Sequence, residues 1–218
     1  MHEIVQNLLH IEKLVKSKQE DFKIIKKPII IAVSKTFKID KILPLIDFGH
    51  IHFGENKVQE ALDKWTNILD ERPNIKLHLI GKLQTNKVKF AIKLFDFIHS
   101  VDNQKLAKKI CEEEKKQKKK IKVFIQVNIS NEIQKSGVEK KDLKDFYIYC
   151  TKLGLDVIGL MCLPPIDNDP TPFFKELKLL NDQLKLPELS MGMSADFIKA
   201  VENNSTYLRI GSNIFGER

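Results

Sequence analysis

Short apolar segments alternate with longer amphipathic segments along almost the whole chain, which has 218 residues. A short apolar run suits a buried parallel strand, whereas apolar residues at three- and four-residue spacing suit a helix that packs on a sheet. The predicted strands are Ile29–Val33, Ile51–Phe53, Leu77–Ile80, Phe97–Val101, Lys122–Val127, Asp156–Met161, Leu189–Met191 and Thr206–Ile210. The predicted helices that follow them are Ile39–Asp47, Lys57–Leu69, Asn86–Leu94, Gln104–Lys119, Lys140–Leu153, Pro172–Leu184 and Ala195–Glu202, and a further helix, Ile4–Lys18, precedes the first strand.

This order of about eight strand–helix units predicts an α/β protein with a single (β/α)8 barrel and an extra N-terminal helix. We expect residues 1–218 to form one domain, because the units occupy about 190 residues and roughly 250 are usual for this fold. The alternative is an open doubly wound sheet. Such a sheet usually has a glycine-rich turn after its first strand, and Ser34–Thr36 contains no glycine.

The net charge of +8, from 37 basic and 29 acidic side chains, raises the alternative of a nucleic-acid-binding or membrane-surface protein. Only three of the basic residues are arginines, however, and the lysines are spread along the chain. The densest charge run, Glu112–Lys120, has acidic residues before basic ones, as helix pairing and the helix dipole favour. We therefore predict a solvated helix end there, and no nucleic-acid or membrane partner.

The three cysteines, Cys111, Cys150 and Cys162, are far apart and form no metal-binding or redox motif. This spacing predicts no disulfide framework and fits a reducing compartment. The N-terminal segment has no apolar signal core, and no apolar run approaches the roughly 18 residues of a membrane span. We expect a soluble, cytoplasmic protein.

Lys35 follows the apolar run Ile29–Val33 directly, in the sequence Ile-Ala-Val-Ser-Lys-Thr. In α/β proteins the carboxyl ends of the strands carry the functional residues. Burial at such a place can lower the pKa of a lysine and free its amine as a nucleophile that reacts with aldehydes. Because 34 of the 37 basic residues are lysines, this position alone does not decide the function.

The last two predicted strands end in segments that suit a phosphate group. Ser190–Ser194 and Arg209–Ser212 each combine a glycine, which permits close backbone approach, with a serine hydroxyl before a helix. In (β/α)8 barrels the loops after the seventh and eighth strands commonly bind phosphate. Ser194 is also predicted as the N-cap of the helix that follows it. The alternative is that these are ordinary turn glycines and capping serines.

Arg209 lies near the end of the last strand, where a charged residue must point into the site or form an ion pair. We predict that it donates a hydrogen bond to a ligand, with a structural ion pair as the alternative. His50, His52, His78 and His99 lie in or beside predicted strands and are candidate metal ligands. No cysteine or carboxylate lies at a supporting spacing, so we predict packed histidines and no metal site.

Seven segments, in order along nearly the whole chain, resemble the motifs of one family. They are Ala32–Thr36, Phe53–Glu60, His78–Lys87, Gln126–Ser130 with Glu132, Lys135 and Gly137, Gly159–Met161, Leu189–Asp196 and Arg209–Gly216. The chain thus resembles the pyridoxal phosphate homeostasis proteins, also called the proline synthetase co-transcribed family. Two positions depart from the family's pattern: Lys38 stands where proline is common, and Asn204 stands where glycine is common.

The resemblance implies a barrel like the N-terminal domain of alanine racemase, the fold of type III pyridoxal phosphate enzymes. It implies pyridoxal phosphate as cofactor, held as an internal aldimine on Lys35. Arg209 would face the pyridine nitrogen, and Asn56 would lie near the ring. Ser194, Gly211 and Ser212 would hold the phosphate.

The resemblance also implies a function in cofactor homeostasis, as a carrier or buffer without efficient turnover, so no catalytic residue is predicted. An arginine beside the ring nitrogen stays protonated and opposes ring protonation, which weakens the ring as an electron sink. Pyridoxal-phosphate-dependent apoenzymes are the expected recipients, and a monomer is expected.

Two other functions remain open. One is a pyridoxal-phosphate-dependent amino-acid racemase or decarboxylase, although no clear second acid or base stands opposite Lys35. Alanine racemase takes that base from an additional β domain, and we expect this chain to be too short to contain one. The other is a basic RNA-binding protein, whose affinity would depend steeply on salt.

Overall fold

The computed structural model describes residues 1–130, 132 and 136–217, and its strands form a closed barrel. The eight strands of the described residues follow one another around the barrel in chain order, and each neighbouring pair is parallel, including β8 with β1. They are β1 (Ile29–Val33), β2 (His52–Glu55), β3 (Lys76–Leu79), β4 (Phe97–Val101), β5 (Lys122–Gln126), β6 (Asp156–Met161), β7 (Glu188–Met193) and β8 (Tyr207–Ile210). The predicted α/β barrel is confirmed.

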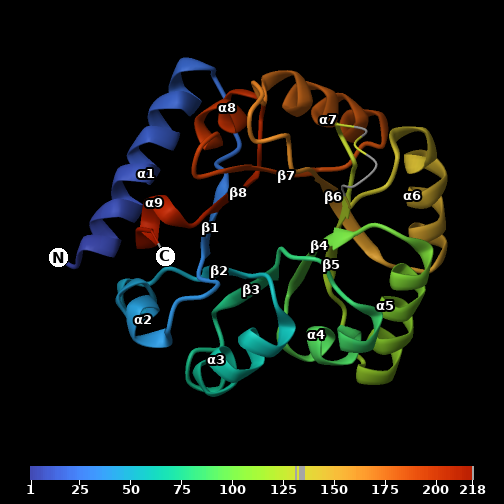
Figure 1. Ribbon diagram of the computed structural model, residues 1–218, viewed down its shortest axis with the longest axis horizontal. Helices are drawn as coiled ribbons and strands as arrows, with labels where there is room; N and C mark the ends of the chain where they lie inside the picture. The colour runs from blue at the N-terminus through green and yellow to red at the C-terminus, as the bar shows by residue number, and fades with distance from the viewer. Residues whose placement is uncertain (131, 133–135, 218) are drawn as a thin grey trace.

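Helices cover the outside of the barrel (Figure 1). They are α1 (Glu3–Asp21), α2 (Ile39–Phe48), α3 (Val58–Glu71), α4 (Val88–Leu94), α5 (Gln104–Gln117), α6 (Leu143–Lys152), α7 (Thr171–Gln183), α8 (Phe197–Glu202) and the short α9 (Ser212–Phe215). The 3-10 turns η1 (Thr85–Lys87) and η2 (Lys140–Asp142) lead into α4 and α6. Each strand therefore returns to the next through a helical crossover, as parallel pairing requires.

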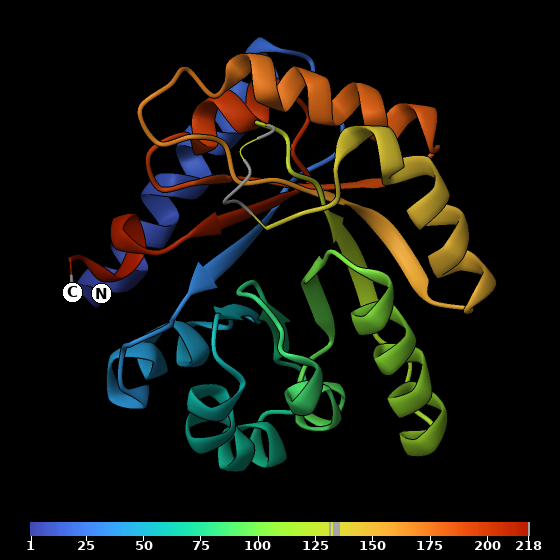
Figure 2. The same ribbon diagram turned by 45° about the vertical axis from the view of Figure 1, so that its right-hand side comes forward.

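The predicted N-terminal helix is present as α1, and it ties the two ends of the chain together. Its buried face includes Leu8, Ile11 and Val15, on the predicted apolar stripe. The Asn7 side-chain amide donates a hydrogen bond to the Ile214 carbonyl oxygen at 3.1 Å. Both termini therefore lie on the same side of the molecule (Figure 2).

Two strands extend past their predicted ends. β2 runs to Glu55, because the backbone of Gly54 and Glu55 continues the ladder with β3. β7 runs to Met193, and α8 begins at Phe197 instead of the predicted Ala195. Gly54 and Glu55 end β2, and Gly192 interrupts the apolar residues at the end of β7, so the apolar pattern alone placed both ends too early.

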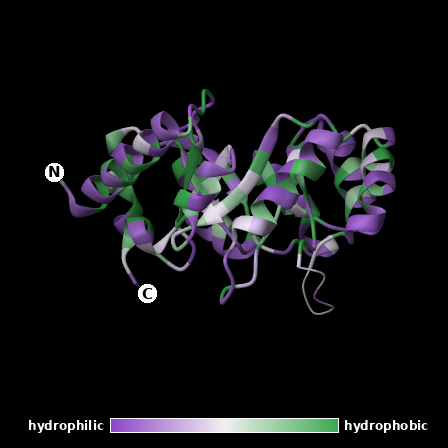
Figure 3. Cartoon of the chain, turned by 90° about the horizontal axis from the view of Figure 1, so that it is seen from above, coloured by the Kyte–Doolittle hydropathy of each residue, from purple (hydrophilic) through white to green (hydrophobic). Residues whose placement is uncertain are grey.

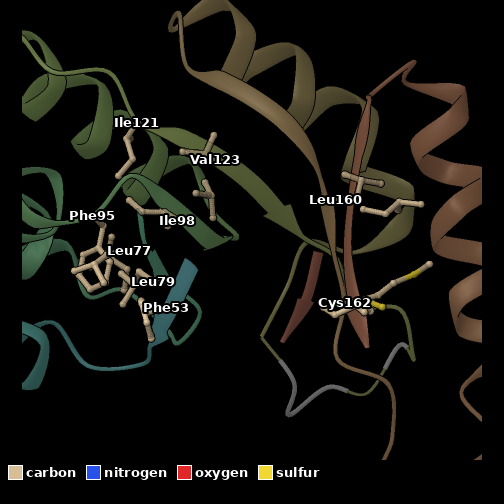
Figure 4. Close-up of a cluster of buried hydrophobic side chains, with 14 of the residues drawn as sticks. Phe53, Leu77, Leu79, Phe95, Ile98, Ile121, Val123, Leu160 and Cys162 are labelled. Carbon is tan, nitrogen blue, oxygen red and sulfur yellow. The ribbon is translucent and has the colours of Figure 1, made fainter. Parts of the chain in front are cut away.

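The apolar core has two layers. The larger layer lies between the strands and the helices, and Figure 4 shows Leu77, Leu79, Phe95 and Ile98 within it. In Figure 3 the outer helices carry both hydrophilic (purple) and hydrophobic (green) residues, as expected for helices with one face against the core. The smaller layer fills the barrel interior with Ile31, Phe97, Phe124, Met161 and Tyr207.

The register of the barrel shifts at three places, and two of these shifts affect polar residues of the interior. Between Ile98 and Val101 the pairing of β4 with β5 is irregular, and between Ser190 and Met193 the pairing of β7 with β8 is irregular. Irregular pairing of this kind redirects side chains and often occurs next to functional sites. His99 and Ser190 lie at these two places, and both are completely buried.

The charge run Glu112–Lys120 is only partly solvated, which corrects the prediction. Glu114 is 2 % exposed, and its carboxylate accepts from the Ile121 backbone N–H and the Lys120 ammonium, both at 2.9 Å. Glu113 is also buried and pairs with Lys109 at 2.9 Å. Glu114 therefore joins α5 to the segment that leads into β5, whereas Glu113 pairs with lysines of α5 itself.

The three cysteines are unpaired and buried. Among the described residues, no helix has the length and apolar character that a membrane span requires. No group of three or more histidine, cysteine or acidic side chains suited to a metal ion occurs there either.

Candidate cofactor site at the carboxyl ends of the strands

Lys35 lies at the carboxyl end of β1, where the sequence places it. Ser34 before it is completely buried, Lys35 is half-buried, and Thr36 is exposed. Thr36 has a φ of 70°, a left-handed conformation that is rare for a β-branched residue. Its backbone N–H donates to the carboxylate of Glu60 on α3, which holds this conformation.

A buried polar network fixes the turn that carries Lys35. The Ser34 hydroxyl donates to Glu55 Oε1 at 2.7 Å, and this oxygen also accepts from Trp65 Nε1 at 2.9 Å. The Lys64 ammonium lies 2.9 Å from Glu55 Oε1 and 2.9 Å from the Ser34 carbonyl oxygen. The carboxyl end of β1 is thus joined to β2 and to α3. The sequence did not predict that Glu55, Lys64 and Trp65 form this network, since none of them stands out as a ligand-binding residue.

The turns after β7 and β8 are joined through Ser194. Its hydroxyl oxygen accepts from the backbone N–H of Gly211 at 3.2 Å and from that of Asn213 at 3.5 Å. Asn213 also donates from its side chain to the Ser194 carbonyl oxygen at 2.9 Å. The prediction that Ser194 caps the following helix is wrong, because Asp196 occupies the N-cap position of α8. Ser212 is exposed at the start of α9.

The two glycines of these segments differ in what they do for the fold. Gly192 has a φ of +93°, and a Cβ there would lie 2.5 Å from the Cβ of Ala200, so the protein's own packing requires glycine. A Cβ at Gly211 would meet only Val33, at an ordinary contact distance of 3.5 Å. Packing within the chain therefore does not explain Gly211, and close approach by a ligand would.

Arg209 is buried inside the barrel, 4 % exposed. Its Nη1 donates to the Ser190 hydroxyl oxygen at 2.6 Å, and its Nη2 donates to the Cys162 carbonyl oxygen at 2.9 Å. Within the described residues, the ion pairs do not include Arg209, so the structural ion pair considered from the sequence is absent there. Burial lowers the pKa of Arg209, and a nearby anionic or acceptor group would offset that cost.

Four hydrogen bonds, three of them buried and the one to His52 partly buried, link Arg209 to three histidines across the barrel. Ser190 Oγ lies 2.8 Å from His99 Nδ1, in addition to its contact with Arg209. His99 Nε2 lies 3.0 Å from His78 Nδ1, and His78 Nε2 lies 2.9 Å from His52 Nδ1. The predicted packed histidines are thus present, but they form a connected chain that residue spacing could not predict. We call His52, His78, His99 and Ser190 the imidazole chain.

Several buried polar atoms at the carboxyl ends of the strands lack a hydrogen-bond partner among the described residues. They include Asn56 Oδ1 after β2, and Asn128 Oδ1 and Ser130 Oγ after β5. Gly81 leaves room for Asn56, since a Cβ at position 81 would lie 2.6 Å from the Asn56 Cβ. Unsatisfied buried polar atoms are costly, and a polar ligand at this end of the barrel would satisfy them. Lys135, one of the motif residues, lies outside the described residues.

The structure brings the six predicted site residues to neighbouring strands. Lys35 and Asn56 follow β1 and β2, Ser194 follows β7, and Arg209, Gly211 and Ser212 belong to β8 and its turn. Strands β7, β8, β1 and β2 are consecutive around the barrel. A hollow of about 840 Å³ lies elsewhere, between α1 and the lysine-rich segment after it, where no strand ends converge.

Comparison with known proteins identifies the family. The sequence profile of the alanine racemase N-terminal domain matches residues 6–218. The pyridoxal phosphate homeostasis protein of Vibrio cholerae is 37% identical over 230 aligned positions, which cover 100% of this chain and 98% of that protein. The chain belongs to the pyridoxal phosphate homeostasis protein family.

Solved structures agree with this family assignment. PipY of Synechococcus elongatus, solved with and without pyridoxal phosphate, is 32% identical in its cofactor-free form, with a TM-score of 0.81 over 93% of this chain and 100% of that one. Alanine racemase of Clostridium difficile is 15% identical, with a TM-score of 0.73 over 99% of this chain and 57% of that one, and it shows the fold alone. The predicted likeness to the alanine racemase barrel is therefore confirmed.

The two departures from the family pattern fit the observed backbone. Asn204 has a φ of 64°, a left-handed conformation that asparagine tolerates better than most residues. Lys38 has a φ of −70° at the N-cap of α2, which is also the value that proline imposes. At both positions the backbone therefore has the conformation that glycine or proline, the common residues of the family there, would favour.

Proposed function

We propose that this chain binds pyridoxal phosphate at the carboxyl ends of β1, β2, β7 and β8, and acts in cofactor homeostasis as a carrier or buffer. The juxtaposition of Lys35 with the turn after β8 carries the proposal. Ala32 pairs with Ile210 in neighbouring strands, so the turn with the amine and the turn with Gly211 lie side by side. The cofactor bound in PipY and the names of the relatives support the same function.

Each site residue has a proposed role that suits its surroundings. The Lys35 amine condenses with the aldehyde of the cofactor, forming a C=N bond with loss of water. The Ser194 hydroxyl, the Gly211 backbone and the Ser212 hydroxyl hold the phosphate. Arg209 donates to the pyridine nitrogen, and Asn56 lies near the ring, where its unsatisfied Oδ1 finds a donor.

We propose further that the protein lacks efficient turnover. When bound, the cofactor supplies an electron sink for reactions at amino-acid carbons, and that sink is strongest when the ring nitrogen is protonated. The Arg209 guanidinium can only donate a hydrogen bond, so it favours an unprotonated ring nitrogen. Within the imidazole chain, His99 Nδ1 lies 2.8 Å from the Ser190 hydroxyl oxygen, so we propose that this imidazole does not serve as a second base.

The remaining biological assignments are also proposals. We propose one domain over residues 1–218, a monomer, a cytoplasmic location suited to unpaired cysteines, and transfer to pyridoxal-phosphate-dependent apoenzymes. We propose no nucleic-acid partner, because two lysines of the densest charge run, Lys116 and Lys120, form ion pairs with glutamates of the same run.

The test of cofactor binding is the absorbance of the protein after incubation with pyridoxal phosphate, followed by borohydride reduction and peptide mapping. We expect a modified Lys35, and Lys35→Ala should abolish both the absorbance and the trapping. Lys38→Ala is the matched control, because Lys38 is exposed and lies in the same turn region. Modification of a different lysine in the parent protein would contradict the assignment.

An enzyme of the racemase or decarboxylase class is the second candidate, favoured by the match to the alanine racemase domain. A panel of amino acids with the cofactor-loaded protein distinguishes the two functions. Turnover above about 1 s⁻¹, a common range for enzymes, would exclude the carrier proposal.

A further inference from the structure

The imidazole chain crosses the barrel interior from the amino end of β2 to Arg209. His52 is half-buried, whereas His78, His99 and Ser190 are completely buried. The contacts are 2.9 Å, 3.0 Å and 2.8 Å long, in order from His52 to Ser190. All three are normal hydrogen-bond lengths, so each imidazole inside the chain donates at one nitrogen and accepts at the other.

Arg209 determines the direction of these hydrogen bonds. A guanidinium has donors and no acceptor, so the Ser190 oxygen accepts from Arg209 Nη1. His99 Nδ1 is the second polar partner of the Ser190 hydroxyl, and the hydroxyl proton is satisfied only if it points there. If His99 Nδ1 were the donor instead, the Ser190 oxygen would accept from two N–H groups. The Ser190 hydroxyl proton would then have no acceptor among the described residues.

The direction of this hydrogen bond then determines the direction of the other hydrogen bonds in the imidazole chain. His99 accepts at Nδ1, so it carries its proton on Nε2 and donates to His78 Nδ1. His78 likewise carries its proton on Nε2 and donates to His52 Nδ1. The dipoles of the His78 and His99 rings therefore have their negative ends toward Arg209 and their positive ends toward His52. Asp96 and Lys76 are the charged groups that act on His52 at the far end.

His78 and His99 must be neutral for all the hydrogen bonds of the imidazole chain to point the same way, and their buried aromatic surroundings keep them neutral. His78 stacks on Phe97 at 4.2 Å, and His99 stacks on Phe124 at 4.3 Å. Burial lowers the pKa of both imidazoles well below 6.5, and the charge of Arg209 adds to this effect at His99. Protonation of either ring would place a second cation near a buried guanidinium.

We propose that His52, His78, His99 and Ser190 are positioning residues, which hold the Arg209 guanidinium toward the cofactor ring and stabilise its charge through one aligned hydrogen-bonded chain. This inference rests on the proposed cofactor site for its functional meaning, but the direction of the chain is a property of the protein alone. It explains how a buried guanidinium persists without a carboxylate partner in the described part of the barrel.

The direction of the chain can be measured without cofactor, by long-range ¹⁵N–¹H correlation spectra of protein labelled at histidine. We expect His78 and His99 to be neutral, with the proton on Nε2. Arg209→Met should remove this preference and give mixed tautomers at His99. Protons on Nδ1 of His78 and His99 in the parent protein, or a His99 tautomer unaffected by Arg209→Met, would overturn the proposal.

The effect on the site can be measured by cofactor titration of His99 variants. His99→Phe keeps an aromatic ring beside Phe124 but removes the acceptor for Ser190, so retention should weaken about tenfold and the absorbance maximum of bound cofactor should shift. His99→Gln has both an acceptor and a donor and should restore most of the affinity. His50→Phe is the matched control, since the His50 ring contacts the His52 carbonyl oxygen and is not part of the chain.

The two kinds of failure are distinguishable. The positioning role would be overturned if His99→Phe kept the parent's cofactor retention and the parent's absorbance maximum. It would also be overturned if His99→Gln and His99→Phe lost cofactor affinity equally. If the parent protein binds no cofactor, the proposed function fails, and the tautomer measurement still decides the direction of the chain. Thermal unfolding of each variant shows whether that variant is folded. If a variant is unfolded, the ¹⁵N–¹H spectra of the parent protein still determine the direction of the hydrogen bonds in the imidazole chain.

Discussion

The hydroxyl oxygen of Ser194 accepts a hydrogen bond from the backbone N–H of Gly211 at 3.2 Å, across 17 residues of sequence. This bond joins the turn after β7 to the turn after β8, so the two predicted phosphate-binding segments form one surface. Because the oxygen already accepts from backbone N–H groups, the hydroxyl proton of Ser194 is the group that would donate to the proposed phosphate ligand.

The double substitution Ser194→Ala with Ser212→Ala should weaken cofactor retention by about 10- to 100-fold, because a hydrogen bond to a charged group contributes roughly 1.5–3 kcal/mol. Equilibrium dialysis against pyridoxal phosphate measures this loss. Thr151→Ala is the control, because its hydroxyl donates to the Ile148 carbonyl oxygen within α6 and lies before the amino end of β6, away from the carboxyl ends of the strands. Unchanged retention in the double variant would place the phosphate at another part of the barrel.

Gly211→Ala and Gly192→Ala should have opposite consequences. Gly211→Ala should leave the melting temperature nearly unchanged but reduce cofactor affinity, since the new Cβ contacts Val33 only at 3.5 Å. Gly192→Ala should lower the free energy of unfolding by about 1–3 kcal/mol or more, because of its positive φ and the contact with Ala200. Thermal unfolding and cofactor titration of both variants provide the comparison. Equal destabilisation by the two would show that Gly211 is a structural glycine.

Lys64→Met should destabilise the protein by about 3–5 kcal/mol, because it leaves the buried Glu55 carboxylate without its ammonium partner. The Lys64 side chain is 8% exposed and that of Glu55 is 0% exposed, so water does not screen the pair. Urea denaturation measures the change. Lys57→Met is the control, because Lys57 is an exposed lysine at the start of the same helix. A loss below about 1 kcal/mol would indicate that the network adds little to stability.

Stability should decrease as the pH falls below about 6.5, the ordinary pKa of histidine. Burial lowers the pKa of His50 to about 4, and it lowers that of His78 and His99 well below 6.5. The unfolded chain therefore binds protons that the folded chain does not, and the free energy of unfolding falls by up to about 1.4 kcal/mol per pH unit for each such histidine.

Urea denaturation at several pH values tests this dependence. His78→Phe should reduce the slope between about pH 6.5 and pH 5 relative to the parent protein. His10→Gln should leave the slope unchanged, because His10 is exposed on α1. An unchanged slope in His78→Phe would mean that His78 is protonated in the folded protein.

The sequence by itself determined the fold and the place of Lys35. Whether a residue faces the core depends on its position within its own strand or helix. A local pattern, such as the apolar run Ile29–Val33, is therefore enough to predict a buried strand. In a barrel of parallel strands, all carboxyl ends lie at one end, and for this reason the residues that follow β1, β2, β7 and β8 could be assembled from chain order alone.

Only the tertiary structure decided which partners these residues have. Ser190 and His99 are 91 residues apart in sequence, and they meet because register irregularities in β4 and β7 lie beside them and the barrel closes. Glu55, Lys64 and Ser34 come together in the same way, from β2, α3 and the turn after β1. Such contacts depend on the stagger and curvature of whole strands, which no local period specifies. The sequence therefore predicted where the proposed site lies, and the closure of the barrel determined the hydrogen-bond network that contacts Arg209.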